Sequence, residues 1–170
     1  MTSWLGFDST TPRVIPSGVF VSPYYNGDYA WHTSDLGRFD SGRAMIDVYA
    51  DAWSACSVLQ VDGTPAQKAR LTELAPQWCA NRESFRPDTA TVYCNRSDLP
   101  ALALAFDNAR VAAPWIWLAT LDGTACLDGV PGGWGKLAAV QGWGEAQLGF
   151  HADASLILSA DWYSHHGGRP

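Results

Sequence analysis

Eight short apolar runs, each followed by polar or turn-forming residues, constrain the fold of this chain more than any other feature. They cover residues 4–7, 18–22, 44–49, 57–61, 90–94, 115–119, 137–141 and 154–158. Several are almost continuously apolar instead of alternating, which is typical of strands covered on both faces, as in parallel sheets. The sequence therefore predicts an α/β domain with one strand for each run.

Helical patterns separate some of these runs. Thr64 can cap a helix that has Pro65 at its first position and Gln67 three residues after the cap. Pro76 falls inside the pattern and is expected to kink or break this helix. A second helix is expected over Leu99–Asn108. The connection between the first two runs contains two prolines, and the one between the third and fourth runs is too short for a full helix.

This order of elements favours a single-domain, irregular and helix-depleted (β/α)8 TIM-like barrel over residues 1–163, with a flexible tail over residues 164–170. The 170 residues are few for a barrel of this kind, which typically has about 250, so several helices must be reduced to loops. An open, doubly wound α/β sheet is the alternative. Eight parallel strands that close on themselves distinguish the barrel from that open sheet.

The composition excludes several classes of protein. With 47% hydrophobic and 16% charged residues, the chain has ample material for a core. The net charge of -6 argues against nucleic acid or an anionic membrane as a partner. Nine tryptophans indicate either extensive aromatic packing or a surface that stacks on flat ligands such as sugars.

The cysteines and the termini give further expectations. No C-x-x-C pair occurs, so we expect neither a metal site nor a cofactor. Free, buried thiols are favoured over disulfides for the four cysteines, Cys56, Cys79, Cys94 and Cys126. The N-terminus has no basic segment followed by a long apolar one, so we expect no signal peptide, and no apolar run is long enough to span a bilayer.

Acidic residues recur where the predicted strands end. In a barrel the working face lies at the carboxyl ends of the strands. Asp8, Asp62 and Asp122 end or follow their runs, the run 44–49 carries Asp47 and is followed by Asp51, and Asp153 lies at the eighth run. Taken singly, each is better explained as a turn or cap residue, as in the pair Asp62-Gly63. Their recurrence favours a site, because glycoside hydrolysis requires two carboxyl groups about a cleft, one protonated and one ionised.

Several pieces of the sequence occur in an order that resembles a known family. The pieces are Gly6-Phe7-Asp8-Ser9, Val58-Leu59-Gln60-Val61-Asp62, Val92-Tyr93-Cys94-Asn95, Trp115-Ile116-Trp117-Leu118-Ala119, Val140-Gln141 and Asp153. The set covers nearly the whole chain. It resembles the GH25-type lysozymes (muramidases) and the related glycoside hydrolase-like domains of actinobacteria and their phages. This resemblance implies an irregular, partly helix-depleted barrel and a bacterial cell-wall glycan as the partner.

The resemblance also implies roles for individual residues. In the family, an Asp on the first strand, an Asp-x-Glu at the end of the fourth and an Asp near the eighth form the active site, and the Glu is the general acid. Asp8 and Asp153 match by position, whereas Gln60 stands in place of the Asp and Asp62 in place of the Glu. Catalytic roles are therefore expected for Asp8, Asp62 and Asp153, with Asp62 as the acid. Substrate binding is expected of Gln60, Tyr24, Tyr25, Gln141 and Trp117.

The two departures at the fourth strand leave two functions open. Asp62 is shorter than Glu by about 1.5 Å, and a misplacement of that size can cost about 100-fold in rate. Gln60 cannot ionise, although its amide can hydrogen-bond a sugar amide. One function is a peptidoglycan-directed glycoside hydrolase of phage or actinobacterial origin with impaired catalysis. The other is a non-catalytic carbohydrate-binding or structural virion or tail domain on the same barrel. Either fits a protein made in the cytoplasm that works with other virion proteins or is released by phage lysis.

Overall fold

The predicted strands are all present in one eight-stranded sheet. The computed structural model describes residues 4–17, 19–39, 43–121 and 134–168. The order of strands in the sheet is β2-β1-β8-β7-β6-β5-β4-β3. Their bounds are β1 Trp4–Asp8, β2 Phe20–Val21, β3 Ile46–Asp47, β4 Val58–Val61, β5 Thr91–Asn95, β6 Trp115–Ala119, β7 Lys136–Trp143 and β8 Asp153–Ile157.

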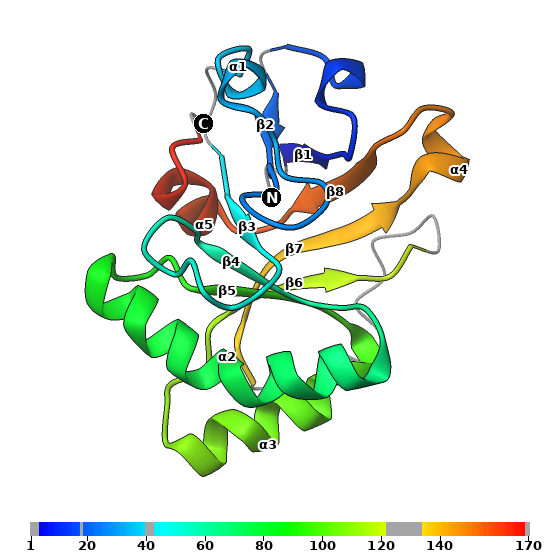
Figure 1. Cartoon of the computed structure of the whole chain (residues 1–170). Coiled ribbons are helices and arrows are strands. Elements are labelled where there is room, and N and C mark those ends of the chain that lie inside the picture. Colours follow the sequence, from blue (N-terminus) through cyan, green and yellow to red (C-terminus); the bar gives the residue numbers. More distant parts are fainter. Residues whose placement is uncertain (1–3, 18, 40–42, 122–133, 169–170) are drawn as a thin grey trace.

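The sheet is curled into a half-barrel and is not the closed barrel of eight parallel strands that we expected (Figure 1). Strand β8 runs antiparallel to both of its neighbours, β1 and β7. The physical reason is the short connection over residues 144–152, because a parallel pair needs a crossover of a dozen or more residues. At the two ends of the sheet, the segments that contain β2 and β3 meet at two isolated bridges among the described residues, Val21–Arg43 and Tyr24–Ile46.

Two long helices, α2 (Pro65–Phe85) and α3 (Leu99–Ala109), lie side by side on one face of the sheet (Figure 1). The predicted capping box starts α2: Thr64 Oγ1 accepts from Gln67 N, and Gln67 Oε1 accepts from Thr64 N. Pro76 was expected to kink or break this helix, and it does not break it, because α2 continues through Pro76 to Phe85. Pro76 is buried with five other residues of α2, and this packing outweighs the cost of about 3 kcal/mol for an internal proline.

The other helices among the described residues are short. They are the 3-10 turns Pro12–Val14 and Arg96–Asp98, α1 (Thr33–Leu36), α4 (Glu145–Leu148) and α5 (Ala160–His165). The expected reduction of helices to loops is therefore seen around the first strands and near the C-terminus. No helix in the described ranges is both long and apolar enough to cross a membrane.

The core has two layers separated by the sheet. The outer layer joins α2 and α3 to strand residues such as Val61, Val92 and Leu118. Burying each such side chain stabilises the fold by about 1.5–3 kcal/mol. Residues that alternate with these, such as Tyr93 and Trp117, face the concave side of the sheet. The helices thus cover one face of the sheet and leave the concave face to the side chains that alternate with the outer layer.

Within residues 164–168, which we expected in a flexible tail, His166 and Gly168 are buried. His166 is buried against the Trp162 ring, with ring centroids 4.3 Å apart, and its carbonyl accepts a hydrogen bond from Arg43 N. Its Nδ1 lies 2.7 Å from the Trp162 carbonyl. Burial lowers the pKa of His166 to about 4. These contacts connect the end of the chain to the segment before β3.

Three cysteines, Cys56, Cys79 and Cys94, are buried and free, as expected. Cys126 lies outside the described residues. Burial raises the pKa of Cys94 to about 12, so this thiol stays protonated and behaves as a small apolar group.

Candidate active site

Two of the expected catalytic acids lie directly opposite each other. Asp8 ends β1 and Asp153 begins β8, and the antiparallel register pairs these two residues. Such pairs have Cβ atoms about 5 Å apart and project to the same face. Asp8 is only 4% exposed, while Asp153 is partly exposed. The two carboxyl groups therefore lie close together, and one of them is buried.

This placement changes the protonation of Asp8. Burial, and then the charge of Asp153, raise the pKa of Asp8 well above its ordinary value. The Tyr24 hydroxyl donates a long hydrogen bond to Asp8, with 3.4 Å between Oη and Oδ1, and opposes the rise. Burial and the charge of Asp8 also raise the pKa of Tyr24, so the phenol remains a donor. Asp8 consequently keeps its proton at pH values at which an exposed aspartate is ionised.

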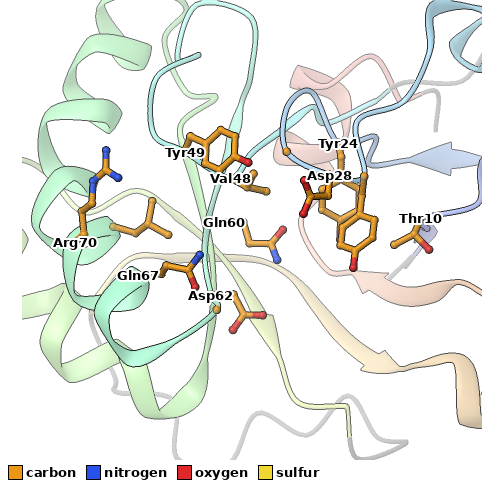
Figure 2. Close-up of a pocket in the computed structure, with 13 residues that line it drawn as sticks. Thr10, Tyr24, Asp28, Val48, Tyr49, Gln60, Asp62, Gln67 and Arg70 are labelled. Atoms are coloured by element: carbon orange, nitrogen blue, oxygen red, sulfur yellow. The ribbon is translucent and has the colours of Figure 1, made fainter.

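Gln60 and Asp62 project from the end of β4 on another wall of the site. They alternate with Val61, which is buried beneath α2, so their side chains turn to the concave face. Figure 2 shows both side chains pointing toward the part of the pocket where Tyr24 and Thr10 lie. The amide and the carboxyl group thus face the same space.

Asp62 forms an ion pair with Lys68. Its side chain is 42% exposed, and Lys68 Nζ lies 3.7 Å from Asp62 Oδ1. The same ammonium lies 3.0 Å from Asp98 Oδ2, and this carboxylate also accepts from Asn95 N at the end of β5. The first turns of α2 are therefore connected to the ends of both β4 and β5.

Two adjoining hollows bring the three acids into one cleft. A pocket of about 390 Å³ opens in front of Gln60 and Asp62, which is within the usual size of a ligand site. A smaller hollow of about 140 Å³ lies in front of Asp8 and Asp153. Thr10 and Tyr24 line both hollows. A ligand that fills the larger pocket can therefore extend to the Asp8–Asp153 pair. Within the described ranges, no cluster of three or more His, Cys, Asp or Glu side chains is arranged to hold a metal ion.

Tyr93 is a site residue that the sequence reasoning missed. It lies on β5, paired with Gln60 of β4. Burial, followed by the charges of Asp8, Asp62 and Asp153, raises its pKa, so the phenol is within electrostatic reach of all three acids. Tyr93 lines neither of the two hollows, so its protonated phenol can donate to a carboxylate from behind the cleft surface. The available clue was alternation, because the residues on either side of Tyr93 are the apolar ones that face the helices.

The residues expected to bind substrate differ in where they lie. Tyr24 and Gln60 line the larger pocket. Tyr25 is 49% exposed and lies outside the linings of both hollows. Gln141 is 1% exposed, and its Oε1 has no hydrogen-bond partner among the described residues. Gln141 therefore lies inside the sheet, below the cleft surface.

Trp117 does not fit the expectation that it binds substrate. It is 2% exposed, and its indole N–H donates to Ser155 Oγ at 2.9 Å. Its ring makes edge contacts with Tyr93 and Trp162, with centroids 5.6 Å and 6.2 Å apart. An enclosed indole cannot offer its face to a sugar. Trp117 instead supports Tyr93 from inside the sheet.

The remaining strand-end acids are not described as part of the cleft. Asp47 is fully buried, and its carboxylate accepts hydrogen bonds of 2.7 to 3.0 Å from Asn26, Trp78 and three backbone N–H groups of residues 49, 50 and 52. Asp47 therefore fixes the loop that follows β3. Asp51 is exposed and accepts from Asn26 Nδ2 at 2.9 Å. Asp122 lies outside the described residues.

Two solved structures share this curled sheet over almost the whole chain. The muramidase from Trichobolus zukalii superposes with a TM-score of 0.60 at 12% identity, covering 98% of this chain and 100% of that chain. The muramidase from Acremonium alcalophilum gives a TM-score of 0.56 at 11% identity, with the same coverage. This chain has a muramidase-like fold. That likeness confirms the expected lysozyme-like fold.

The sequence comparisons add nothing to this fold assignment. No model of a known protein family matches the chain, and no curated protein matches it in sequence. Identities of 11% and 12% establish a shared fold alone. The function must therefore be argued from the side chains of the cleft.

Proposed function

We propose that this chain is a peptidoglycan-directed glycoside hydrolase of the muramidase class. The observation that carries this proposal is the Asp8–Asp153 pair, which adjoins the pocket containing Asp62. Such a cleft holds both carboxyl forms that glycoside hydrolysis needs, one protonated and one ionised. The muramidase-like fold supports a cell-wall glycan as the substrate.

In the proposed reaction, Asp62 donates a proton to the glycosidic oxygen as the bond from that oxygen to the anomeric carbon breaks. Positive charge develops at the anomeric carbon, and Asp153, which lies beside the protonated Asp8, supplies the opposing negative charge. Water then adds its hydroxyl group to this carbon and returns a proton to Asp62. The reaction draws on carboxyl groups and water alone.

We propose that this catalysis is impaired relative to a site that has Asp and Glu at these two positions. Gln60 contributes no charge, although its amide can hold a sugar amide group in place. Asp62 lacks one methylene of reach toward the glycosidic oxygen, and geometric errors near 1 Å can cost about 100-fold in rate.

A second candidate function is a non-catalytic carbohydrate-binding or structural virion domain. The observation that favours it is the uncharged Gln60 at the centre of the cleft, paired with Tyr93. A cleft with aromatic and amide groups can bind sugars without cleaving them.

In either case we propose a phage or actinobacterial origin, on the sequence resemblance, with delivery to the wall aboard a virion or on lysis. The position of the gene among lysis genes or among virion genes tests this origin.

The release of reducing ends from purified cell walls tests the hydrolase proposal. The wild type is compared with Asp62→Asn and with Asp107→Asn, a matched change at an exposed aspartate of α3 outside the cleft. We expect release by the wild type and by Asp107→Asn, and at least about 100-fold less by Asp62→Asn.

Binding to the same walls, measured by co-sedimentation, separates the two candidates. A wild type that binds walls but releases no reducing ends would support the binding domain and contradict the hydrolase. Equal release by the wild type and Asp62→Asn would remove Asp62 from the role of acid and leave the hydrolase class standing.

A further inference from the structure

The larger pocket continues beyond the acids to a basic residue that the proposed reaction does not use. Figure 2 shows Thr10 and Arg70 at opposite ends of this pocket, with Gln60 and Asp62 between them. Arg70 lies in the second turn of α2. Gln67, Arg70 and Leu71 all line the pocket, as expected for positions three and four apart on one helix face. Arg70 is therefore at the end of the cleft farthest from the Asp8–Asp153 hollow.

The charges around this pocket make Arg70 distinctive. Among the described residues that line it, Asp28 and Asp62 are the acids and Arg70 is the only cation. Lys68, two residues earlier, forms its ion pairs with Asp98 and Asp62. The Arg70 side chain is exposed, and no carboxylate of the described ranges lies within 4.0 Å of it in an ion pair. Its guanidinium is thus available to a ligand in the pocket.

A guanidinium in this position favours an anionic ligand over a neutral one. Its planar fork binds a carboxylate through two parallel hydrogen bonds, which a neutral sugar hydroxyl does not match. The chain carries a net charge of -6, so an anionic glycan meets general repulsion unless a local cation offsets it. Peptidoglycan strands are anionic, because the lactyl group of each muramic acid either ends in a free carboxylate or is linked through an amide to a stem peptide that carries carboxylates. Chitin oligomers carry neither group.

We propose that Arg70 is a specificity-determining residue that binds a carboxylate of the glycan strand, at a sugar beyond those that contact Asp62. This inference rests on the proposed function and names the substrate class more closely: a glycan bearing carboxylates. Exposed Tyr49, which also lines the pocket, flanks the same ligand position and supplies an aromatic edge for the sugar ring.

Equilibrium binding of three soluble probes to the full chain tests this inference. The probes are peptidoglycan fragments with intact stems, the same fragments after an amidase has removed the stems and left the lactyl carboxylates, and chitin oligomers of equal length. The variants are Arg70→Gln, Arg70→Lys and, as a matched control, Arg110→Gln at the exposed end of α3.

We expect Arg70→Gln to weaken binding of a carboxylate-bearing probe about fivefold and to leave chitin binding unchanged. Arg70→Lys should keep part of the affinity, Arg110→Gln all of it, and the difference between wild type and Arg70→Gln should shrink at high salt. A loss only with the amidase-treated fragments assigns the lactyl carboxylate as the ligand, and a loss only with intact stems assigns a stem carboxylate. A loss with both peptidoglycan probes means that Arg70 accepts either carboxylate.

The inference is overturned if Arg70→Gln binds all three probes as the wild type does, or loses affinity for chitin equally. A wild type that binds none of the probes overturns it as well. Because binding is measured and not turnover, failure of the hydrolase proposal remains distinct. A chain that releases no reducing ends can still show the selective effect of Arg70→Gln, and an active chain can lack it.

Discussion

Asp8 on β1 and Asp153 on β8 form a directly opposed pair across antiparallel strands, with Asp8 buried and Asp153 partly exposed. Two carboxyl groups in this arrangement cannot both carry a full charge without a free-energy cost. Burial, and then this repulsion, raise the pKa of Asp8, so the protonation of the site is coupled to the stability of the fold.

The first prediction is that Asp8→Asn stabilises the protein at neutral pH and reduces its activity. An amide does not ionise in either state, so it removes the cost of keeping a buried carboxyl group protonated, or of ionising it beside Asp153. We expect the free energy of unfolding to rise by about 1 kcal/mol or more at pH 7 and reducing-end release to fall about 100-fold. Because the folded pKa of Asp8 is raised, its ionisation lowers stability as the pH rises, so the gain should be smaller at pH 4. Urea unfolding at both pH values measures this, and a variant less stable than the wild type at pH 7 contradicts it.

The second prediction concerns the end of β4. The double variant Gln60→Asp with Asp62→Glu restores a second carboxylate and the missing methylene. We expect reducing-end release to increase about tenfold or more, because the acid gains about 1.5 Å of reach and the cleft gains a charge opposite the developing cation. Gln60→Asn, which changes length without adding charge, is the control. No increase by the double variant, with its fold intact by circular dichroism, would mean that these two positions do not limit the rate.

The third prediction is that Asp47→Asn is strongly destabilising. The Asp47 carboxylate accepts from two side chains and three backbone N–H groups, and an amide turns an N–H₂ group toward some of these donors. We expect a loss of about 3 kcal/mol in the free energy of unfolding by urea. Asp51→Asn, at an exposed acid, should cost less than about 1 kcal/mol. Equal losses for the two variants would contradict the structural role given to Asp47.

The fourth prediction concerns His166, whose burial lowers its pKa from 6.5 to about 4. A group whose folded pKa is lowered contributes its full stability above its unfolded pKa and loses it as the pH falls. We therefore expect the free energy of unfolding to fall by at most about 3 kcal/mol between pH 6.5 and pH 4. The trend opposes that of Asp8, so the informative quantity is the difference between wild type and His166→Phe. That difference should change over this pH range, and a constant difference would show that His166 does not titrate as described.

Local patterns in the sequence predicted most of the elements but not how they pair. The apolar runs and the Thr64–Gln67 capping box are set by neighbours in the chain, and each was found. The antiparallel direction of β8 depends on a short connection and on which strands it lies beside, and the runs themselves do not express this. The survival of α2 through Pro76 likewise depends on burial against the sheet and α3.

In the site, too, residues with similar positions in the sequence have different tertiary environments. Asp47 and Asp62 both lie at strand ends in the sequence, yet Asp47 is a fully buried hydrogen-bond acceptor and Asp62 is a half-exposed group in the cleft. Trp117 and Tyr93 face the same side of neighbouring strands, yet Trp117 is enclosed and Tyr93 lies among the acids.

By itself, the sequence determined the strands, the first turn of α2 and the acids near the strand ends, because these follow from periodicity and capping over a few residues. Only the tertiary structure decided that Asp8 faces Asp153, that Tyr93 joins the three acids and that Arg70 stands at the far end of their pocket. The reason is physical: burial and charge proximity depend on distances between segments far apart in the chain, which local sequence does not specify.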